Sequence, residues 1–578
     1  MGHILTFTKR YAFPLWGWYL TGTVMLALVN ILALEIPQLV KEIGNTLTSN
    51  GDLSQTTHIA YLIIGMGFTL LIVRALSRIL IFWPGRNIET SLKGDMFKKT
   101  LALPQSILLK FGMGDLISRL ANDVGQVRVL FAFGLLQFLN MIFLLIFTIS
   151  KMGSVHLGLT IACIVPCSLM VFVIRIAGPH MHKYSKIQQK AVGRLTNKVT
   201  EAFVNVHVIQ SNAAEKSFEK IAAIENNTVY TADIRLVFIR TTLFIMMPLF
   251  AAISQLVILV YGGSEAMKGN ITVGDIMAFN IYIGLLMFPL TAMGFLIAIY
   301  QRAKTAIERI GEIDDAEIET TVASNATSSK EWLLEVKNLS FKYPDMIHQD
   351  EVTGSTDKGT PFELKNVSFQ IKAGERIGIF GSIGSGKSTL FNVITRLFDP
   401  PPGTVFWNGQ DILSIDATAL RRQIGYALQT VHLFSNTIRE NLKFGLEDLT
   451  QDQLDEAAKN ACVYDEIMGL DRNWETEIGE KGVRLSGGQK QRLALARIFI
   501  RTPSLLILDD VLSAVDHSTE QRLIKNMFAI GGSMLIASHR ASSLKPCDKI
   551  LILNDGQIAD QGTFAQMADK YPDLEQED

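Results

Sequence analysis

The chain has 578 residues, more than one hydrophobic core can organise, so at least two domains are expected. Its composition is 48% hydrophobic and only 19% charged, and its mean hydropathy is positive, which argues against disordered, fibrous and strongly solvated classes and favours a membrane protein. The 54 Lys and Arg residues balance 55 Asp and Glu residues, for a net charge of −1. This balance lacks the basic footprint of nucleic-acid binding, so no nucleic-acid partner is expected.

Apolar segments long enough to cross a bilayer are concentrated in the first half of the chain. A membrane-spanning helix needs about 20 apolar residues, and six segments meet this requirement, at 14–36, 59–83, 129–150, 154–176, 241–263 and 276–300. The first follows a short Lys9-Arg10 flank and has no small-residue cleavage site, so we interpret it as a retained helix rather than a secretory signal. Residues 1–320 are therefore predicted to form a transmembrane domain of six helices.

The distribution of basic residues predicts how these helices are oriented in the lipid bilayer. Lys and Arg gather between the second and third spans and between the fourth and fifth spans. Because positively charged loops stay on the cytoplasmic side, these two segments and both termini are predicted to be cytosolic. Both segments are polar and helical in pattern, with few Pro or Gly, so helices two to five are expected to continue well into the cytosol.

The character of the chain changes after residue 320. Residues 321–332 have the polar, Ser- and Thr-rich composition of a linker, and residues 333–578 alternate short β-rich runs with helical patterns, which is typical of a soluble α/β domain. Within it, RIGIFGSIGSGKSTLFNVI indicates a strand, a glycine-rich loop and a helix. The loop fits GxxxxGKS/T, a pattern whose backbone N–H groups cradle phosphates at a helix N-terminus.

Individual side chains of this domain suggest roles at a nucleotide. Lys387 can reach the terminal phosphates of a nucleotide, and Ser388 can ligate Mg²⁺. Downstream, SLLILDD is an apolar strand that ends in two carboxylates, and Asp509 is the candidate to organise Mg²⁺. LSGGQ at 485–489 places a Ser hydroxyl and two Gly N–H groups at a helix start, an anion site able to take a γ-phosphate.

In their order and spacing these motifs resemble those of ATP-binding cassette (ABC) exporters, bacterial half-transporters of the multidrug or lipid type in which six membrane helices are fused to one nucleotide-binding domain. The other motifs that carry the resemblance are an A-loop aromatic (Tyr343), a Q-loop glutamine (Gln429), an X-loop-like TEIGEKG segment (476–482), a D-loop (513–516) and a switch histidine (His539). Residues 114–128 and 269–290 extend it into the membrane half.

By this resemblance the glycine-rich loop (381–389) is the Walker A motif, the strand 505–509 is Walker B, and LSGGQ (485–489) is the signature. The resemblance implies a dimer in which each ATP lies between the Walker motifs of one chain and the signature of the other. Tyr343 would stack on adenine, and two short helices near 105–111 and 206–213 would couple the membrane and nucleotide-binding domains. The implied metal ligands are Ser388, Gln429 and Asp509, and the implied catalytic residues are Asp510, His539 and Gln429. The implied ATP contacts are Tyr343, Gly381, Ser382, Gly384, Ser385, Gly386, Lys387, Ser388, Thr389 and Gln429, with Ser486, Gly487, Gly488 and Gln489 facing the partner's ATP.

One position departs from the family pattern. The residue after the Walker B strand is normally the glutamate that polarises the attacking water, and here it is Asp510. The aspartate side chain is shorter than that of glutamate by one methylene, and misplacing a catalytic group by about 1 Å costs about a hundredfold in rate. With an intact signature, this predicts the slow-site half of a heterodimeric exporter. The alternative is a homodimeric lipid flippase or drug exporter with two equal sites.

Several properties stay open at this level. Hydrophobic small molecules, lipids and peptides all suit an exporter in a bacterial cytoplasmic membrane. An ATP-gated channel or a regulatory subunit would share the same architecture, whereas an importer would normally carry its membrane helices on separate chains. The polar stretch 345–361 is longer than a hairpin needs and is expected to be a surface loop.

Overall fold

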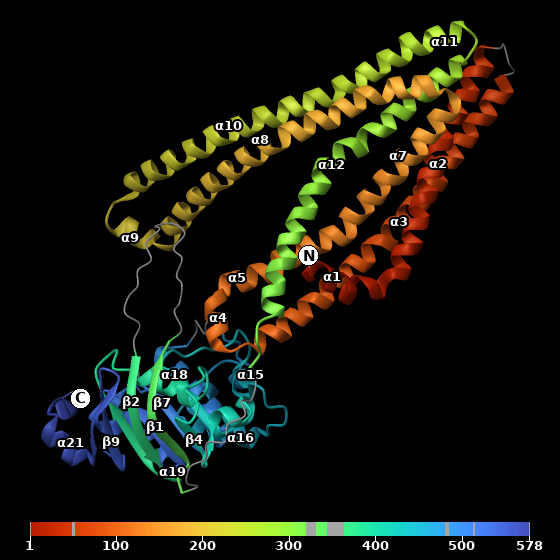
Figure 1. Ribbon diagram of the computed structural model, residues 1–578. Coiled ribbons are helices and arrows are strands. Elements are labelled where there is room, and N and C mark those ends of the chain that lie inside the picture. The colour runs from red at the N-terminus through yellow and green to blue at the C-terminus, as the bar shows by residue number, and fades with distance from the viewer. Residues whose placement is uncertain are drawn as a thin grey trace. The chain divides into compact units, whose positions relative to one another are not determined.

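The computed structural model describes most of the chain: residues 2–48, 53–319, 331–343, 363–479, 485–512 and 515–576. It divides into two compact units, of which the first comprises Met1–Lys99 and Gly114–Asp315 and the second comprises Thr100–Met113 and Ala316–Asp578 (Figure 1). Most of the predicted linker 321–332 and the whole predicted loop 345–361 lie outside the described residues. The domain boundaries inferred from the sequence therefore stay predictions.

The first unit consists of helices, several of them very long. The longest are α3 (Leu53–Leu101), α8 (Leu157–Val204), α10 (Glu215–Val257) and α12 (Val273–Asp314), with 49, 48, 43 and 42 residues. At 1.5 Å per residue each is roughly 60–75 Å long, about twice the hydrocarbon thickness of a bilayer. Each therefore has room for a membrane span and an extension. The remaining helices are α1 (Gly2–Phe7), α2 (Trp16–Thr48), α5 (Met113–Ser118), α6 (Val124–Val129), α7 (Leu135–Val155), α9 (Val206–Ser211) and α11 (Gly263–Met267), with single π-helical or 3₁₀ turns between some of them.

Composition and length identify five candidate membrane spans among the described residues: His3–Thr48, Ser54–Leu101, Met113–Val155, Pro248–Met267 and Val273–Asp314. Each contains or overlaps one of the predicted apolar segments. The predicted span 154–176 lies in α8, where the described apolar stretch is shorter, Leu157–Pro166. A multi-pass helical membrane domain is thus confirmed, and the count of six spans stays a prediction.

Two kinds of packing occur within the first unit. Helices α2, α7 and α12 pack together, and around them a core forms from buried residues such as Leu34, Phe279 and Ile283. Helices α8 and α10 run side by side along most of their length (Figure 1). The pair leaves large apolar side chains uncovered, among them Phe203 and Phe238, which are 73% and 74% exposed.

The second unit contains two sheets. A four-stranded antiparallel sheet has the order β2-β1-β4-β5, built from β1 (Leu334–Lys342), β2 (Glu363–Ile371), β4 (Val405–Trp407) and β5 (Gln410–Asp411). A six-stranded sheet has the order β10-β9-β3-β8-β7-β6, built from β3 (Arg376–Phe380), β6 (Ile424–Ala427), β7 (Leu505–Asp509), β8 (Ser533–Ala537), β9 (Lys549–Asn554) and β10 (Gln557–Gly562). The predicted strands before the glycine-rich loop and the carboxylates are β3 and β7.

In the larger sheet all neighbouring strands except β9 and β10 are parallel. Every residue of β7 and β8 is buried, as expected for strands covered on both faces. The helices of this unit are α4 (Gln105–Phe111), α13 (Lys387–Ile394), α14 (Ala417–Gln423), α15 (Ile438–Lys443), α16 (Gln451–Asn460), α17 (Tyr464–Met468), α18 (Gly487–Phe499), α19 (His517–Ile530), α20 (Ala541–Leu544), α21 (Phe564–Lys570) and α22 (Asp573–Gln576).

The close packing of the edge strand β6 yields a stability prediction. A Cβ atom at Gly425 would lie 2.4 Å from Cγ2 of Ile498 and 2.7 Å from Cγ of Pro503, and the proline ring cannot turn away. Gly425→Ala should therefore lower the free energy of unfolding by about 1–3 kcal/mol. Thermal unfolding of the detergent-solubilised chain measures this effect, with Gly479→Ala as control because a Cβ there meets no atom of the described residues within 4 Å. Equal melting temperatures for the two variants would contradict the packing.

Candidate nucleotide-binding site

The predicted nucleotide-binding residues follow four neighbouring strands of the six-stranded sheet. The register pairs Ile379 and Asp509 with Ala537 of β8, and Ala427 with Leu508 of β7. Because parallel strands end at the same edge, the loops after β3, β8, β7 and β6 open on one side of the sheet. The glycine-rich loop, His539, Asp510 and Gln429 lie on these loops, and Asp509 is the last residue of β7.

The glycine-rich loop has a backbone that suits phosphate binding. Gly384 and Gly386 have φ angles of +84° and +107°, which side-chain-bearing residues adopt only with strain. A Cβ at Gly381 would lie 2.2 Å from the carbonyl oxygen of Leu553, so this position also requires glycine. Helix α13 begins directly after Gly386, and its first N–H groups therefore face the loop. This is the cradle that a phosphate group needs.

Lys387 and Ser385 add side-chain groups to the cradle. The Lys387 ammonium donates hydrogen bonds to the carbonyl oxygens of Gly381 and Ser382, at 2.6 and 3.0 Å, so it lies against the loop. The Ser385 hydroxyl is buried and makes no hydrogen bond with the described residues. A buried hydroxyl normally has a partner, and a phosphate oxygen in the loop would supply one.

The predicted metal-binding pair is assembled at the end of β7. Asp509 is only 4% exposed. Burial raises the pKa of its carboxyl group, while a hydrogen bond from Ser388 and the charge of Lys387 oppose that rise. Ser388 and Asp509 therefore contact each other directly. Gln429 lies two residues beyond the end of β6 at the same edge of the sheet, and its side chain is exposed.

Asp510 occupies an unusual backbone position beside the switch histidine. Its φ angle is +48°, and its N–H donates to the carbonyl oxygen of Ala537 at 2.9 Å. Burial raises the pKa of Asp510, whereas the charges of His539, Lys387 and Arg540 lower it. The structure thus brings Asp510 and His539 near the loop lysine, and their catalytic roles stay predictions.

A hydrogen-bond network beside the glycine-rich loop escaped the sequence analysis. Asn392 of α13 donates to the Tyr343 hydroxyl and accepts from the Tyr426 hydroxyl, both at 3.3 Å, and the Tyr343 hydroxyl donates to Thr389 at 3.4 Å. Tyr426 also hydrogen-bonds to Asp509. Asn392 lies in the helix predicted after the glycine-rich loop, but neither Asn392 nor Tyr426 is among the site residues expected from the sequence. Stacking of Tyr343 on adenine stays a prediction.

The signature motif forms the start of a helix. Ser486 is the N-cap of α18 and accepts a hydrogen bond from the Gln489 N–H at 3.2 Å, while the Gln489 side chain accepts from the Ser486 N–H at 2.9 Å. This reciprocal capping places the N–H groups of Gly487 and Gly488 at the positive end of the helix. Residues 480–482 of the TEIGEKG segment and 513–514 of the D-loop lie outside the described residues.

Comparison with known proteins agrees with this geometry. Residues 19–290 match the ABC transporter transmembrane region, and residues 364–513 match the ABC transporter domain. The chain is 31% identical, over 97% of its length and 94% of the relative, to the probable multidrug resistance ABC transporter ATP-binding/permease protein YheI of Bacillus subtilis. It is 27% identical, over 97% of its length and 94% of the relative, to the multidrug resistance-like ATP-binding protein MdlA of Escherichia coli.

The fold is also that of a solved exporter. A bacterial Atm1-family ABC exporter with ATP bound superposes with a TM-score of 0.79 at 24% identity, covering 97% of this chain and 98% of that one. Together with the assembled phosphate loop, these similarities establish that the chain belongs to the ABC transporter family, as a membrane exporter that couples ATP hydrolysis to transport.

Proposed function

We propose that this chain is the slow-site half of a heterodimeric exporter that moves hydrophobic or amphipathic substrates across a bacterial cytoplasmic membrane. The observation that carries the proposal is Asp510, which stands where the catalytic glutamate belongs, combined with an intact signature at 485–489. Such a chain holds ATP at its own Walker motifs and completes a faster site on its partner.

The geometry around Asp510 supports slow hydrolysis at this site. Its backbone N–H is bound to Ala537 on the buried strand β8, so a shift of Asp510 that made up for the missing methylene would break this hydrogen bond. A general base must lie within hydrogen-bonding reach of the attacking water. An aspartate on this backbone leaves that water roughly 1 Å farther away, which is enough to lower the rate about a hundredfold.

The α8 and α10 pair supports a second half-transporter as partner. Apolar side chains are exposed near α9, at the far end of the pair from α11, where Phe203, Val204 and Val208 are 73%, 75% and 60% exposed. At about 1.5 Å per residue, this end of the 48-residue α8 extends beyond a bilayer-spanning length. Apolar groups in water favour a protein partner, and we assign α4 and α9 as the coupling helices.

Within the nucleotide site we assign roles to residues that lie together. The loop N–H groups and Lys387 hold the phosphates, and Tyr343 stacks on the adenine. Ser388, Asp509 and Gln429 offer the hydroxyl, carboxylate and amide oxygens that Mg²⁺ prefers, and the direct contact between Ser388 and Asp509 fits such a site. When bound, Mg²⁺ would neutralise charge on the phosphates.

The names of the relatives bear on the substrate class, and the basic loops bear on the orientation in the membrane. The relatives are named for multidrug resistance, which favours apolar drugs over lipids and peptides as substrates. Because basic loops stay on the cytoplasmic side of a membrane, we assign both termini and the nucleotide-binding domain to the cytosol. ATP-driven accumulation of ethidium, Hoechst 33342 or a fluorescent phospholipid in proteoliposomes tests export, because a channel or a regulatory subunit cannot concentrate a substrate against its gradient.

Two substitutions test the nucleotide site directly. Lys387→Ala and Asp509→Asn each remove a charge that holds the triphosphate or Mg²⁺, and charge-assisted hydrogen bonds of this kind contribute about 1.5–3 kcal/mol. ATP binding at this chain's site should weaken about tenfold or more, as measured with a fluorescent ATP analogue. Lys525→Ala, on the exposed face of α19, is the control. Unchanged affinity in both variants would refute the assignment.

If the two ATP sites hydrolyse at different rates, removing the carboxylate from one site should change the ATPase rate much less than removing it from the other. Asp510→Asn should reduce the steady-state ATPase rate of the heterodimer by less than about twofold, because the partner's site carries most turnover. Replacing the partner's glutamate by Gln should lower the rate about a hundredfold or more. If this chain alone formed a brisk ATPase that Asp510→Asn abolished, the homodimer with two equal sites would be correct.

The signature motif should act on the partner's nucleotide. Ser486→Ala removes a hydroxyl that faces the other chain's γ-phosphate, so the ATPase rate should fall about tenfold, given the strength of hydrogen bonds to charged groups. Binding of ATP to this chain's own Walker site should not change. A variant that instead lost ATP binding in this chain and kept its turnover would show that the signature acts within one chain.

A further inference from the structure

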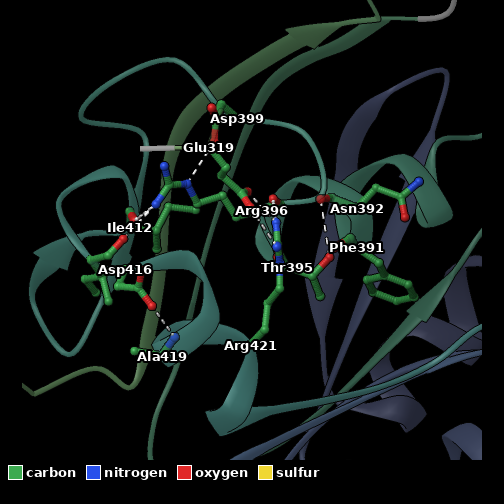
Figure 2. Close-up of polar contacts among 11 residues, drawn as sticks. Glu319, Phe391, Asn392, Thr395, Arg396, Asp399, Ile412, Asp416, Ala419 and Arg421 are labelled. Atoms are coloured by element: carbon green, nitrogen blue, oxygen red, sulfur yellow. Dashed lines mark hydrogen bonds and ion pairs between the residues drawn. The ribbon is translucent and has the colours of Figure 1, made fainter. Parts of the chain in front are cut away.

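Helix α13, which directly follows the glycine-rich Walker A loop, is called the Walker helix here. Arg421 lies against its C-terminal end (Figure 2). Its Nε atom donates to the carbonyl oxygen of Thr395 at 3.1 Å, and its Nη2 atom donates to the carbonyl oxygen of Arg396. Thr395 is the C-cap residue of α13, and Arg396 follows it. A positive charge at this end of a helix interacts favourably with the helix dipole. Arg421 therefore fixes the end of the helix whose start holds the phosphate loop.

The same guanidinium group binds Glu319. Nη1 and Nη2 donate to the two carboxylate oxygens of Glu319 at 2.9 and 2.6 Å (Figure 2). This two-pronged arrangement is the strongest geometry for an arginine–carboxylate pair, and the side chains are only 34% and 19% exposed. Glu319 stands five residues beyond Asp314, the last residue of α12.

Glu319 also contacts the chain segment that follows α3. Its backbone N–H donates to the carbonyl oxygen of Ala102 at 3.2 Å, and Ala102 comes directly after the end of α3. The chain passes between the two units at 99/100, 113/114 and 315/316. Ala102 follows the passage at 99/100, and Glu319 follows the passage at 315/316. Through Glu319, both of these passages are therefore connected to Arg421.

The receiving end of this connection is rigid. Arg396 is 1% exposed, its φ angle is +53°, and its side chain donates to Asp399 at 2.8 Å and to the carbonyl oxygen of Ile415 at 2.7 Å. Asp416 caps α14, which carries Arg421, by accepting from the Ala419 N–H at 2.8 Å. A displacement of Glu319 would therefore be passed to α13 rather than absorbed by a loose loop.

We propose that Glu319 and Arg421 form a positioning contact that links movement of the membrane-helix ends to the Walker helix. Capping of α13 needs only Arg421, because a carboxylate near the negative end of a helix is itself unfavourable. We therefore assign Glu319 a different role, which is to connect Arg421 with the ends of α3 and α12. The inference rests on the proposed function, since it assigns a path by which ATP binding and transport influence each other.

Hydrogen–deuterium exchange of the full complex in lipid nanodiscs tests the contact without knowledge of the substrate. Exchange is compared without nucleotide and with ATP plus vanadate, in peptides covering 376–395 and 100–113. In the native protein ATP should slow exchange in both. In Glu319→Gln the ATP-dependent change in 100–113 should fall at least threefold, and the change in 376–395 should stay. Glu317→Gln is the matched control, because Glu317 is an exposed acid on the same segment.

Each outcome decides between the proposals. A Glu319→Gln variant with the full ATP response in 100–113, or a native protein without a response there, overturns the contact. A native protein without a response in 376–395 overturns the nucleotide site and, with it, the proposed function. A second variant, Arg421→Lys, guards against misfolding of a single variant. It should reduce the ATP-dependent change in 100–113 as much as Glu319→Gln does. The double variant of Glu319→Gln and Arg421→Lys should reduce this change no further, since both substitutions break the same interaction.

Discussion

The functional site depends on the parallel pairing of β3, β8, β7 and β6. A parallel register leaves the carboxyl ends of all four strands at one edge, so the loop, the aspartates, the histidine and the glutamine meet although more than 150 residues separate them in the sequence. A one-residue slip would exchange the side chains of β7 and β8 between the two covered faces of the sheet, where the neighbours are closely packed around the present side chains. Packing on both faces therefore favours the register that holds ATP.

Much of this site was predictable because its chemistry is local. The glycine-rich loop, the strand before it and the helix start at Ser486 each occupy a few consecutive residues, and backbone sterics and capping dictate their conformations. Contacts between distant segments gave no such signal. Asn392 and Tyr426 join only when α13 lies on β6, and Arg421 meets Glu319 across 102 residues. The sequence predicts six membrane spans, whereas the described residues contain five candidate spans and a shorter apolar stretch in α8, so that number stays a prediction.

The two proposals describe different ends of one element. At its start, α13 carries the loop and Lys387, which face Asp509 at the end of β7 and Asp510 directly after it. At its end, Arg421 ties the helix to the segment that leaves α12. A site that hydrolyses slowly can still hold ATP for long periods. Through Arg421, such a held nucleotide would keep the membrane-helix ends in one arrangement while the partner's site turns over.

The central claim is that this chain retains ATP while its partner hydrolyses it. Photoaffinity labelling of the complex during turnover, with 8-azido-ATP radiolabelled at either the α- or the γ-phosphate, measures this for each chain separately. The account predicts that this chain carries both labels, because it holds intact ATP, and that the partner carries mainly the α label, because it holds ADP. Equal loss of the γ label from both chains would contradict it.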